Sequence, residues 1–354
     1  MPTFPERFPA NLRRAAFLIV AAIQLVTLAA CGGGGGYGGG GGSTPVSGVG
    51  PSKLFAADSP HMAIGSLANP DPGTGAISVD RTIVGPIYTG LTNNIGSLAL
   101  DPVLDYLYVG IGTSVRVFYA ASTDNGDVTP PRTIILGGGN TGSMFLDTAH
   151  DRLYVGDDVN GVKVFSGAST ANGSPTPRLI SGNFGATFLI HGVAVDTGTN
   201  DILYVSNTNH TSSSDQISVF DGASTVSGST TPSRTITPTI SGTPQTVGGI
   251  FLDAAHDVLY VAGGSAGMQV MVFANASTAN DTAGATNPGK TLSGFPTGIL
   301  SVVVDTTHDR LYAVGLNGHI YLVEAVSTLS SGAVVAKDAS ISGGTLTAVA
   351  VNPN

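Results

Sequence analysis

The sequence is poor in cysteine, tryptophan and charge. Its 354 residues include one cysteine, no tryptophan and only 10% charged residues, with a formal net charge of -9. A single cysteine excludes an internal disulfide and leaves no cysteine-based zinc site. Phosphate binding needs a basic stripe, and no Lys/Arg run occurs outside the N-terminus, so nucleic acid is an unsuitable partner. The chain also lacks the His-Glu-x-x-His motif of zinc proteases.

Apolar residues, glycine and proline are abundant instead. Hydrophobic residues make up 42% of the chain, which also contains 50 glycines and 20 prolines. Intrinsic disorder requires few apolar residues and a high net charge, so we expect a folded chain. Short Val-, Ile- and Thr-rich runs separated by Gly, Pro, Ser and Asn indicate many short strands joined by turns.

The N-terminus has the pattern of a secretory signal peptide. Arg13 and Arg14 precede an apolar stretch that starts at Ala15 and ends in Leu28-Ala29-Ala30-Cys31. The alternative is a transmembrane helix with an incidental cysteine, but about 16 apolar residues fall short of the ~20 that span a bilayer. Leu28 to Cys31 resembles the bacterial lipobox, which implies that residues 1–30 are removed and that Cys31 becomes the lipidated, palmitate-bearing N-terminus. Because Gly32 rather than Asp follows, the resemblance implies a location in the cell envelope, at the outer membrane of a Gram-negative bacterium.

Residues 31–52 are predicted to be a tether between the lipid and a folded body. The glycine-rich stretch after Cys31 can neither pack nor hold regular structure. A flexible chain of this length has a root-mean-square reach on the order of 25 Å. The folded body, residues 53–354, can therefore stand clear of the membrane surface.

That body consists of repeats with a period near fifty residues. Each repeat opens with an apolar run that ends in aspartate, at Asp101, Asp147, Asp196, Asp253 and Asp305. A Leu-Tyr-(Val/Ala) run follows, with its tyrosine at Tyr108, Tyr154, Tyr204, Tyr260 or Tyr312. A third run such as Val115-Arg-Val-Phe118 leads into Ala-Ser-Thr, and a fourth starts with a basic residue, as in Arg132-Thr-Ile-Ile. The four runs are too short for helices and predict four strands per repeat.

The two ends of the body predict how the repeats close into a ring. Lys53-Leu-Phe-Ala-Ala-Asp58 matches a second strand, whereas the final run Thr347 to Asn352 matches a first strand without a repeat of its own. We therefore predict an all-β, six-bladed β-propeller of four-stranded antiparallel blades, closed by pairing of the C-terminal strand with the N-terminal blade.

The repeat motifs resemble those of a known class of proteins. The combination of (Gly/Ser)-x-x-x-Asp, Leu-Tyr-Val, Val-x-Val-Phe and Pro-x-Arg-Thr-Ile is similar to the NHL-type and YVTN-type propeller repeats of secreted bacterial proteins, over nearly all of residues 53–354. The resemblance implies the propeller fold. It does not imply an activity, because related propellers include binding proteins, scaffolds and lactonases.

Residues that recur with the repeat are interpreted as structural. His150, His256 and His308 occupy the same turn, as do Asp105, Asp151, Asp257 and Asp309, and we expect them to form hydrogen bonds within that hairpin. The basic residues that open the fourth strands are expected to protect the outer edges as solvated charges. The alternative for these basic residues is a belt that binds a carbohydrate or a lipid headgroup.

Residues that break the repeat are the better candidates for a ligand face. Propellers generally bind ligands through loops that join strand two to three and strand four to the next blade. The candidates in those loops are Tyr88, Asn93, Asn94, Asn140, Phe184, His191, Asn207, Asn209, His210, Gln245, Phe295 and His319.

The function predicted from these features is non-catalytic. We expect a lipid-anchored module that binds or scaffolds a protein or glycan partner at the cell envelope, with no catalytic residue and no cofactor. The alternative is a metal-dependent lactonase or related hydrolase with a divalent cation in the central channel. Glu324 is the only glutamate after residue 30, which weakens that alternative, although Asn93, Asn94, Asn140 and His191 have acceptable ligand atoms. A third possibility is a structural subunit of a surface assembly, which an exposed apolar patch would favour.

Overall fold

A computed structural model describes residues 53–59, 63–67, 79–84, 95–182, 184, 188–209, 215–263, 267–281, 286–338 and 345–352. These residues form strands and turns, with no helix in the described ranges and therefore none long and apolar enough to cross a membrane. The predicted signal peptide, Cys31 and the tether lie outside the described residues.

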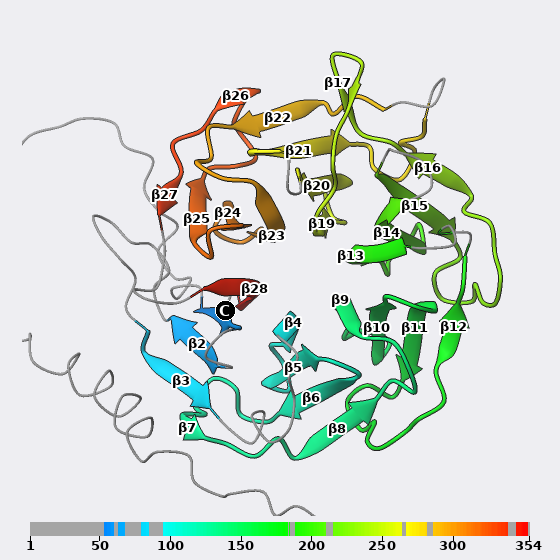
Figure 1. Ribbon diagram of the computed structural model, residues 1–354, viewed down its shortest axis with the longest axis vertical. Helices are drawn as coiled ribbons and strands as arrows, with labels where there is room; N and C mark the ends of the chain where they lie inside the picture. Colours follow the sequence, from blue (N-terminus) through cyan, green and yellow to red (C-terminus); the bar gives the residue numbers. More distant parts are fainter. Residues whose placement is uncertain are drawn as a thin grey trace, which may run out of the picture. The chain divides into compact units, whose positions relative to one another are not determined.

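Six sheets stand around a common centre as the blades of a propeller (Figure 1). Each has four antiparallel strands, ordered from the centre outwards. Blade 1 contains β28 (Leu346–Asn352), β1 (Lys53–Asp58), β2 (Ala63–Leu67) and β3 (Arg81–Val84). Blade 2 contains β4 (Ile95–Asp101), β5 (Tyr106–Ile111), β6 (Ser114–Phe118) and β8 (Arg132–Ile135). Blade 3 contains β9 (Thr141–Asp147), β10 (Arg152–Asp157), β11 (Gly161–Ser166) and β12 (Arg178–Ile180).

The second half of the ring repeats this order. Blade 4 contains β13 (Phe188–Asp196), β14 (Ile202–Asn209), β15 (Gln216–Asp221) and β16 (Arg234–Ile236). Blade 5 contains β19 (Ile250–Asp253), β20 (Val258–Ala262), β21 (Gln269–Ala274) and β22 (Lys290–Ser293). Blade 6 contains β23 (Ile299–Asp305), β24 (Arg310–Gly315), β25 (Ile320–Glu324) and β27 (Lys337–Asp338). The predicted six-bladed fold is confirmed.

Short additional strands extend the outer edges of the blades. The strands β7 (Gly126–Asp127) and β26 (Gly332–Ala333) add in parallel to β3 and β22 of the preceding blades. A small hairpin of β17 (Thr239–Ile240) and β18 (Thr243–Pro244) projects from the ring between blades 4 and 5 (Figure 1). Because β7 and β26 pair with the outermost strand of a neighbouring blade, they cover backbone groups that would otherwise form an open edge.

The C-terminal strand closes the ring as predicted. Antiparallel pairing of β28 with β1 places Val351 opposite Leu54 and Val349 opposite Ala56. The first and last described strands of the chain thus share one sheet, so the ring is held shut by backbone hydrogen bonds as well as by packing.

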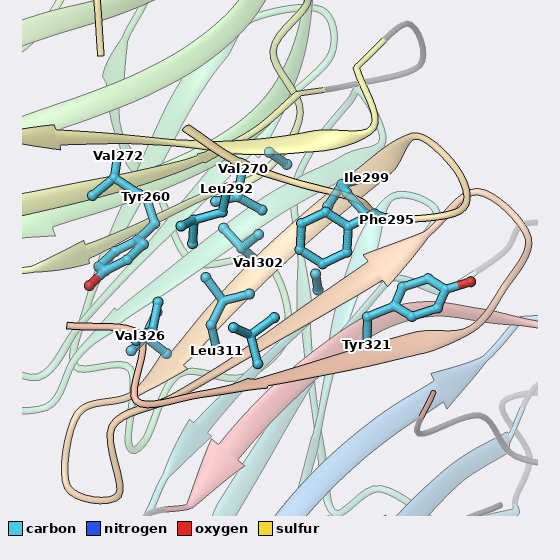
Figure 2. Packing of buried hydrophobic residues seen from close by; sticks show 14 residues of the cluster. Tyr260, Val270, Val272, Leu292, Phe295, Ile299, Val302, Leu311, Tyr321 and Val326 are labelled. Atoms are coloured by element: carbon cyan, nitrogen blue, oxygen red, sulfur yellow. The ribbon is translucent and has the colours of Figure 1, made fainter. Parts of the chain in front are cut away.

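The hydrophobic core lies between the blades. Leu153 to Asp157 of β10 are all buried, because neighbouring blades cover both faces of the strand. Double coverage requires consecutive apolar residues, which explains why Leu-Tyr-Val recurs without polar alternation. Figure 2 shows one such interface, in which Tyr260, Val270 and Leu292 of blade 5 pack against Val302 and Leu311 of blade 6.

The recurring tyrosines and basic residues connect adjacent blades. The Tyr108 hydroxyl donates to the Ala168 carbonyl of blade 3 at 3.1 Å, and Arg132 donates to the carbonyls of Ala168 and Ala171 at 3.0 and 2.7 Å. The expectation that the basic residues are solvated edge charges is therefore wrong for Arg132, which is buried. Equivalent bonds to the next blade come from Arg178, Arg234 and Lys290.

The recurring histidines bond within their turns as expected, whereas the recurring aspartates beside them bond elsewhere. The Nδ1 atom of His150 lies 2.9 Å from Asp147, and His256 and His308 repeat the contact with Asp253 and Asp305. The second aspartate of the turn differs from the expectation. It adopts a positive φ, 52° at Asp151, and its carboxylate accepts hydrogen bonds from the Ser169 amide and hydroxyl beyond the third strand rather than from its own hairpin. The Ala-Ser-Thr motif is the partner that this aspartate requires.

Candidate functional site

The six innermost strands surround a central channel of about 460 Å³. Glycines at the start of these strands allow them to converge. A Cβ added to Gly96 would lie 2.7 Å from the Thr141 carbonyl of the next blade, and one added to Gly142 would lie 2.7 Å from the Ile190 carbonyl. The glycine that precedes the apolar run is therefore required by the close approach of neighbouring backbones. We call the end where the inner strands begin the upper end.

The channel wall changes character along its length. Near the lower end it carries half-buried apolar side chains, among them Leu146 and Leu252. Ser143 also lines the channel, three residues before Leu146 in β9, which places it about 10 Å higher at the usual rise of a strand. Ser301 occupies the equivalent position of β23 and lines the channel at the same level. His191 at the upper end is the one ionisable side chain among the described lining residues. The described part of the wall thus carries no ionisable side chain below the upper end, with hydroxyl groups above an apolar base.

An exposed apolar patch lies beside the upper mouth of the channel. Met268, Leu300 and Leu316 are 55%, 37% and 46% exposed. Backbone hydrogen bonds bring their segments together, because the Ile299 amide donates to Gly267 at 3.2 Å and the Leu316 amide donates to Gly298 at 2.9 Å. Leu300 also lines the channel. We call these three residues the rim patch.

Three of the predicted ligand-face residues are closed to a ligand. Phe184 packs edge-on against Phe220 with ring centroids 5.7 Å apart, and Phe295 packs against Tyr321 at 6.1 Å. Asn207 lies in β14 rather than in a loop, and its Oδ1 accepts a hydrogen bond from Ser218. All three side chains are buried, so we interpret them as parts of the core.

Other predicted residues lie at the upper end but do not converge on one point. The Asn140 side chain donates to Asp158 at 2.8 Å, and His319 contacts Asp338 at 2.8 Å. Gln245 accepts a hydrogen bond from Gln269. These bonds hold loops of blades 3, 5 and 6. Among the predicted ligand-face residues that the structure describes, His191 is the one that lines the channel.

The remaining predicted residues are not placed. Tyr88, Asn93, Asn94 and His210 lie outside the described residues, and for Asn209 the backbone of β14 alone is described. Among the described residues, no three His, Cys, Asp or Glu side chains form a group that could hold a metal ion.

A buried ion pair at the top of blade 3 was not predicted. Lys163 forms a salt bridge with Asp157 and donates to the Gly138 carbonyl at 2.6 Å. Asp157 also accepts from the amides of Val159 and Asn160, both at 2.8 Å. The repeat alone does not distinguish this lysine, because the equivalent position of the third strand carries Arg116, Ser218 or Met271 in other blades. Because every polar atom here faces another protein group, the pair serves the fold.

Two stretches match catalytic motifs by residue spacing alone. Gly263 to Gly267 has the Gly-x-Ser-x-Gly spacing of a nucleophile elbow, but it joins the antiparallel strands β20 and β21, whereas an elbow joins a strand to a helix. Gly284 to Thr291 has the spacing of a phosphate-binding loop, but it leads into strand β22 and not into a helix whose N-terminus could hold phosphate. Lys290 of this stretch instead donates to the Ser327 carbonyl of blade 6 at 2.9 Å. Neither stretch has the structural context of its motif.

Comparison with known proteins assigns the chain to no family. No protein-family model matches the chain, and no curated protein matches it. One similar solved chain belongs to a structure described as "Crystal Structure of Mitotic Checkpoint Complex"; it is 14% identical, with 91% of this chain and 92% of that chain covered and a TM-score of 0.49. At this identity and TM-score the likeness carries no argument about the fold or the function. The architecture therefore rests on the chain's own sheets and their closure, and by that architecture the protein is a six-bladed β-propeller.

Proposed function

We propose that the protein is a non-catalytic binding module of the cell envelope that docks a protein partner on the rim patch. The patch carries this proposal because Met268, Leu300 and Leu316 are exposed and backbone hydrogen bonds hold their segments next to one another. Contiguous exposed apolar side chains on a folded domain mark interaction surfaces. A rigid ring is also a suitable scaffold, because its loops are held in place by the blades.

The chemistry of the patch favours a protein over a glycan. Its three side chains are aliphatic or thioether groups, which contribute hydrophobic contact area and no hydrogen bonds. Apolar side chains of another protein match such a surface, whereas a glycan presents many hydroxyl groups that the patch would leave without partners. A structural subunit of a surface assembly would use the same patch with a constant partner.

We propose the lipid anchor from the N-terminal sequence, whose lipobox-like run ends in Cys31. Lipidation of Cys31 and the tether that follows would hold the propeller at the outer membrane. Replacing Cys31 with serine is then expected to move the protein from the detergent-extracted membrane fraction to the soluble fraction. Unchanged fractionation of C31S would contradict the anchor.

Site-specific photo-crosslinking on cells tests the docking surface. A benzoylphenylalanine residue at Leu316 is expected to crosslink one partner. The same residue at Val103, which is exposed in the turn between β4 and β5 at the opposite end of the ring, is the matched control. Met268→Asp should weaken crosslinking from position 316 at least tenfold, because a charge in an apolar interface is costly. Equal crosslinking from both positions, or no effect of M268D, would contradict docking on the patch.

The hydrolase alternative has its own test. Elemental analysis of the purified protein after dialysis without chelator is expected to find no stoichiometric divalent metal if the module is non-catalytic. One tightly held ion per chain would favour the metal-dependent hydrolase, and lactone turnover would then be the assay.

A further inference from the structure

We propose that the central channel binds a small, uncharged, amphipathic molecule with an apolar body and a single carbonyl or hydroxyl group at its upper end. This site is separate from the function proposed for the rim patch, and the two fail by different experiments. The volume of about 460 Å³ lies in the range of natural pockets for small organic molecules.

The lower part of the channel fits the apolar body. Half-buried Leu146 and Leu252 line it together with Phe145 and Phe251, whose rings also pack against Tyr154 and Tyr260 at 6.3 and 6.5 Å. Transferring an apolar group from water to a position against these apolar side chains is favourable.

The upper part provides the polar contact. The Ser143 hydroxyl oxygen accepts a hydrogen bond from the Val193 amide at 3.1 Å, which fixes the side chain and leaves its proton to be donated. The Thr347 hydroxyl differs, because it donates its proton to the Ile95 carbonyl at 3.0 Å. A carbonyl or hydroxyl oxygen in the channel at this level can therefore accept from Ser143.

The charge of the wall selects an uncharged molecule. Apart from His191 at the mouth, the described lining residues carry no ionisable group. An ion that moved below the mouth would lose its hydration without gaining a counter-charge, which is strongly unfavourable. The ligand class is thus a neutral molecule about 10 Å long or shorter, because that is the distance between the serine level and the apolar base.

Equilibrium dialysis of the full chain against naphthalene and 2-naphthol tests the proposal. The two probes share an apolar body, and the second adds one hydroxyl group. We expect both to bind with one site per chain, and 2-naphthol to bind about fivefold more tightly, the usual effect of one neutral hydrogen bond. No saturable binding of either probe would overturn the proposal.

Two variants locate the site. Ser143→Ala should reduce the preference for 2-naphthol to about onefold while naphthalene still binds. Ser301→Phe should fill the channel and weaken both probes at least tenfold. Ser166→Phe is the matched control, since Ser166 is exposed at the end of β11, away from the channel.

A folded S301F protein that binds both probes as the wild type does would overturn the site, as would an S166F protein that loses them. If S301F does not fold, S143A decides alone, because it only removes one oxygen: an unchanged preference for 2-naphthol overturns the proposal. Crosslinking from position 316 should be unaffected by S143A, which separates this test from that of the rim patch.

Discussion

The buried ion pair of blade 3 allows a quantitative test of how the propeller is stabilised. The side chains of Lys163 and Asp157 are 6% and 0% exposed. Replacing Lys163 with methionine keeps much of the volume but leaves the carboxylate without a counter-charge. Removing one partner of a buried pair costs about 3 to 5 kcal/mol. We expect a value near the lower limit, because three donors from Val159 and Asn160 remain on the carboxylate.

The expected loss is large enough to measure by calorimetry. At about 2 °C per kcal/mol for a domain of this size, K163M should lower the melting temperature by roughly 6 °C. Lys337→Met is the matched control, because Lys337 pairs with Glu324 at 3.2 Å on the surface and both side chains are partly exposed. A surface pair contributes about 0 to 1 kcal/mol, so K337M should change the melting temperature by less than about 2 °C.

A double variant separates the charge from the packing. Asp157→Asn combined with K163M removes both charges and keeps an acceptor for the backbone amides. The free energy of unfolding that the double variant loses should therefore be smaller than the sum of the losses of the two single variants, by about 1 kcal/mol or more. If the losses are additive, or if K163M melts together with K337M, the ion pair does not stabilise blade 3 in the way argued.

Three further perturbations test the ring. Deleting Leu346–Asn352 removes the strand that pairs with β1, so the protein should lose its cooperative thermal transition; an unchanged melting curve would refute closure by this strand. Gly142→Ala should destabilise the fold by about 2 kcal/mol, because the added Cβ would meet a backbone carbonyl of the next blade that cannot move freely. Gly173→Ala is the control: this site has open space, so the variant should show only the strain of its positive φ. Burial raises the pKa of three recurring tyrosines, Tyr108, Tyr204 and Tyr260, from about 10 to about 12. The unfolded chain therefore ionises first, so the stability that these hydroxyls contribute is complete below pH 10 and should be lost between pH 10 and about 12. Urea titrations that show no loss of stability over this range would contradict burial of the three hydroxyls.

The repeat made the ring predictable from sequence. The number of residues from Asp305 to Asn352 is similar to the sequence spacing of the repeated aspartates, which assigns the last run to a first strand. Since each blade buries both faces, its strands require uninterrupted apolar runs, and those runs can be counted without a structure. The number of blades, the order of strands, the closure and the turn histidines follow from these local patterns.

Contacts between blades depended on tertiary structure. Arg132 bonds to Ala168, 36 residues away in the chain, and no local pattern distinguishes that partner from solvent. Phe184 and Asn207 break the repeat and suggest a ligand face, yet both side chains are buried, Phe184 against Phe220 and Asn207 beside Ser218. The rim patch likewise exists because Gly267 and Gly298 bring together turns from two blades. Sequence periodicity determines which residues enter a strand, whereas the docking of one blade on the next decides which polar groups are paired, which side chains are covered and where the channel opens.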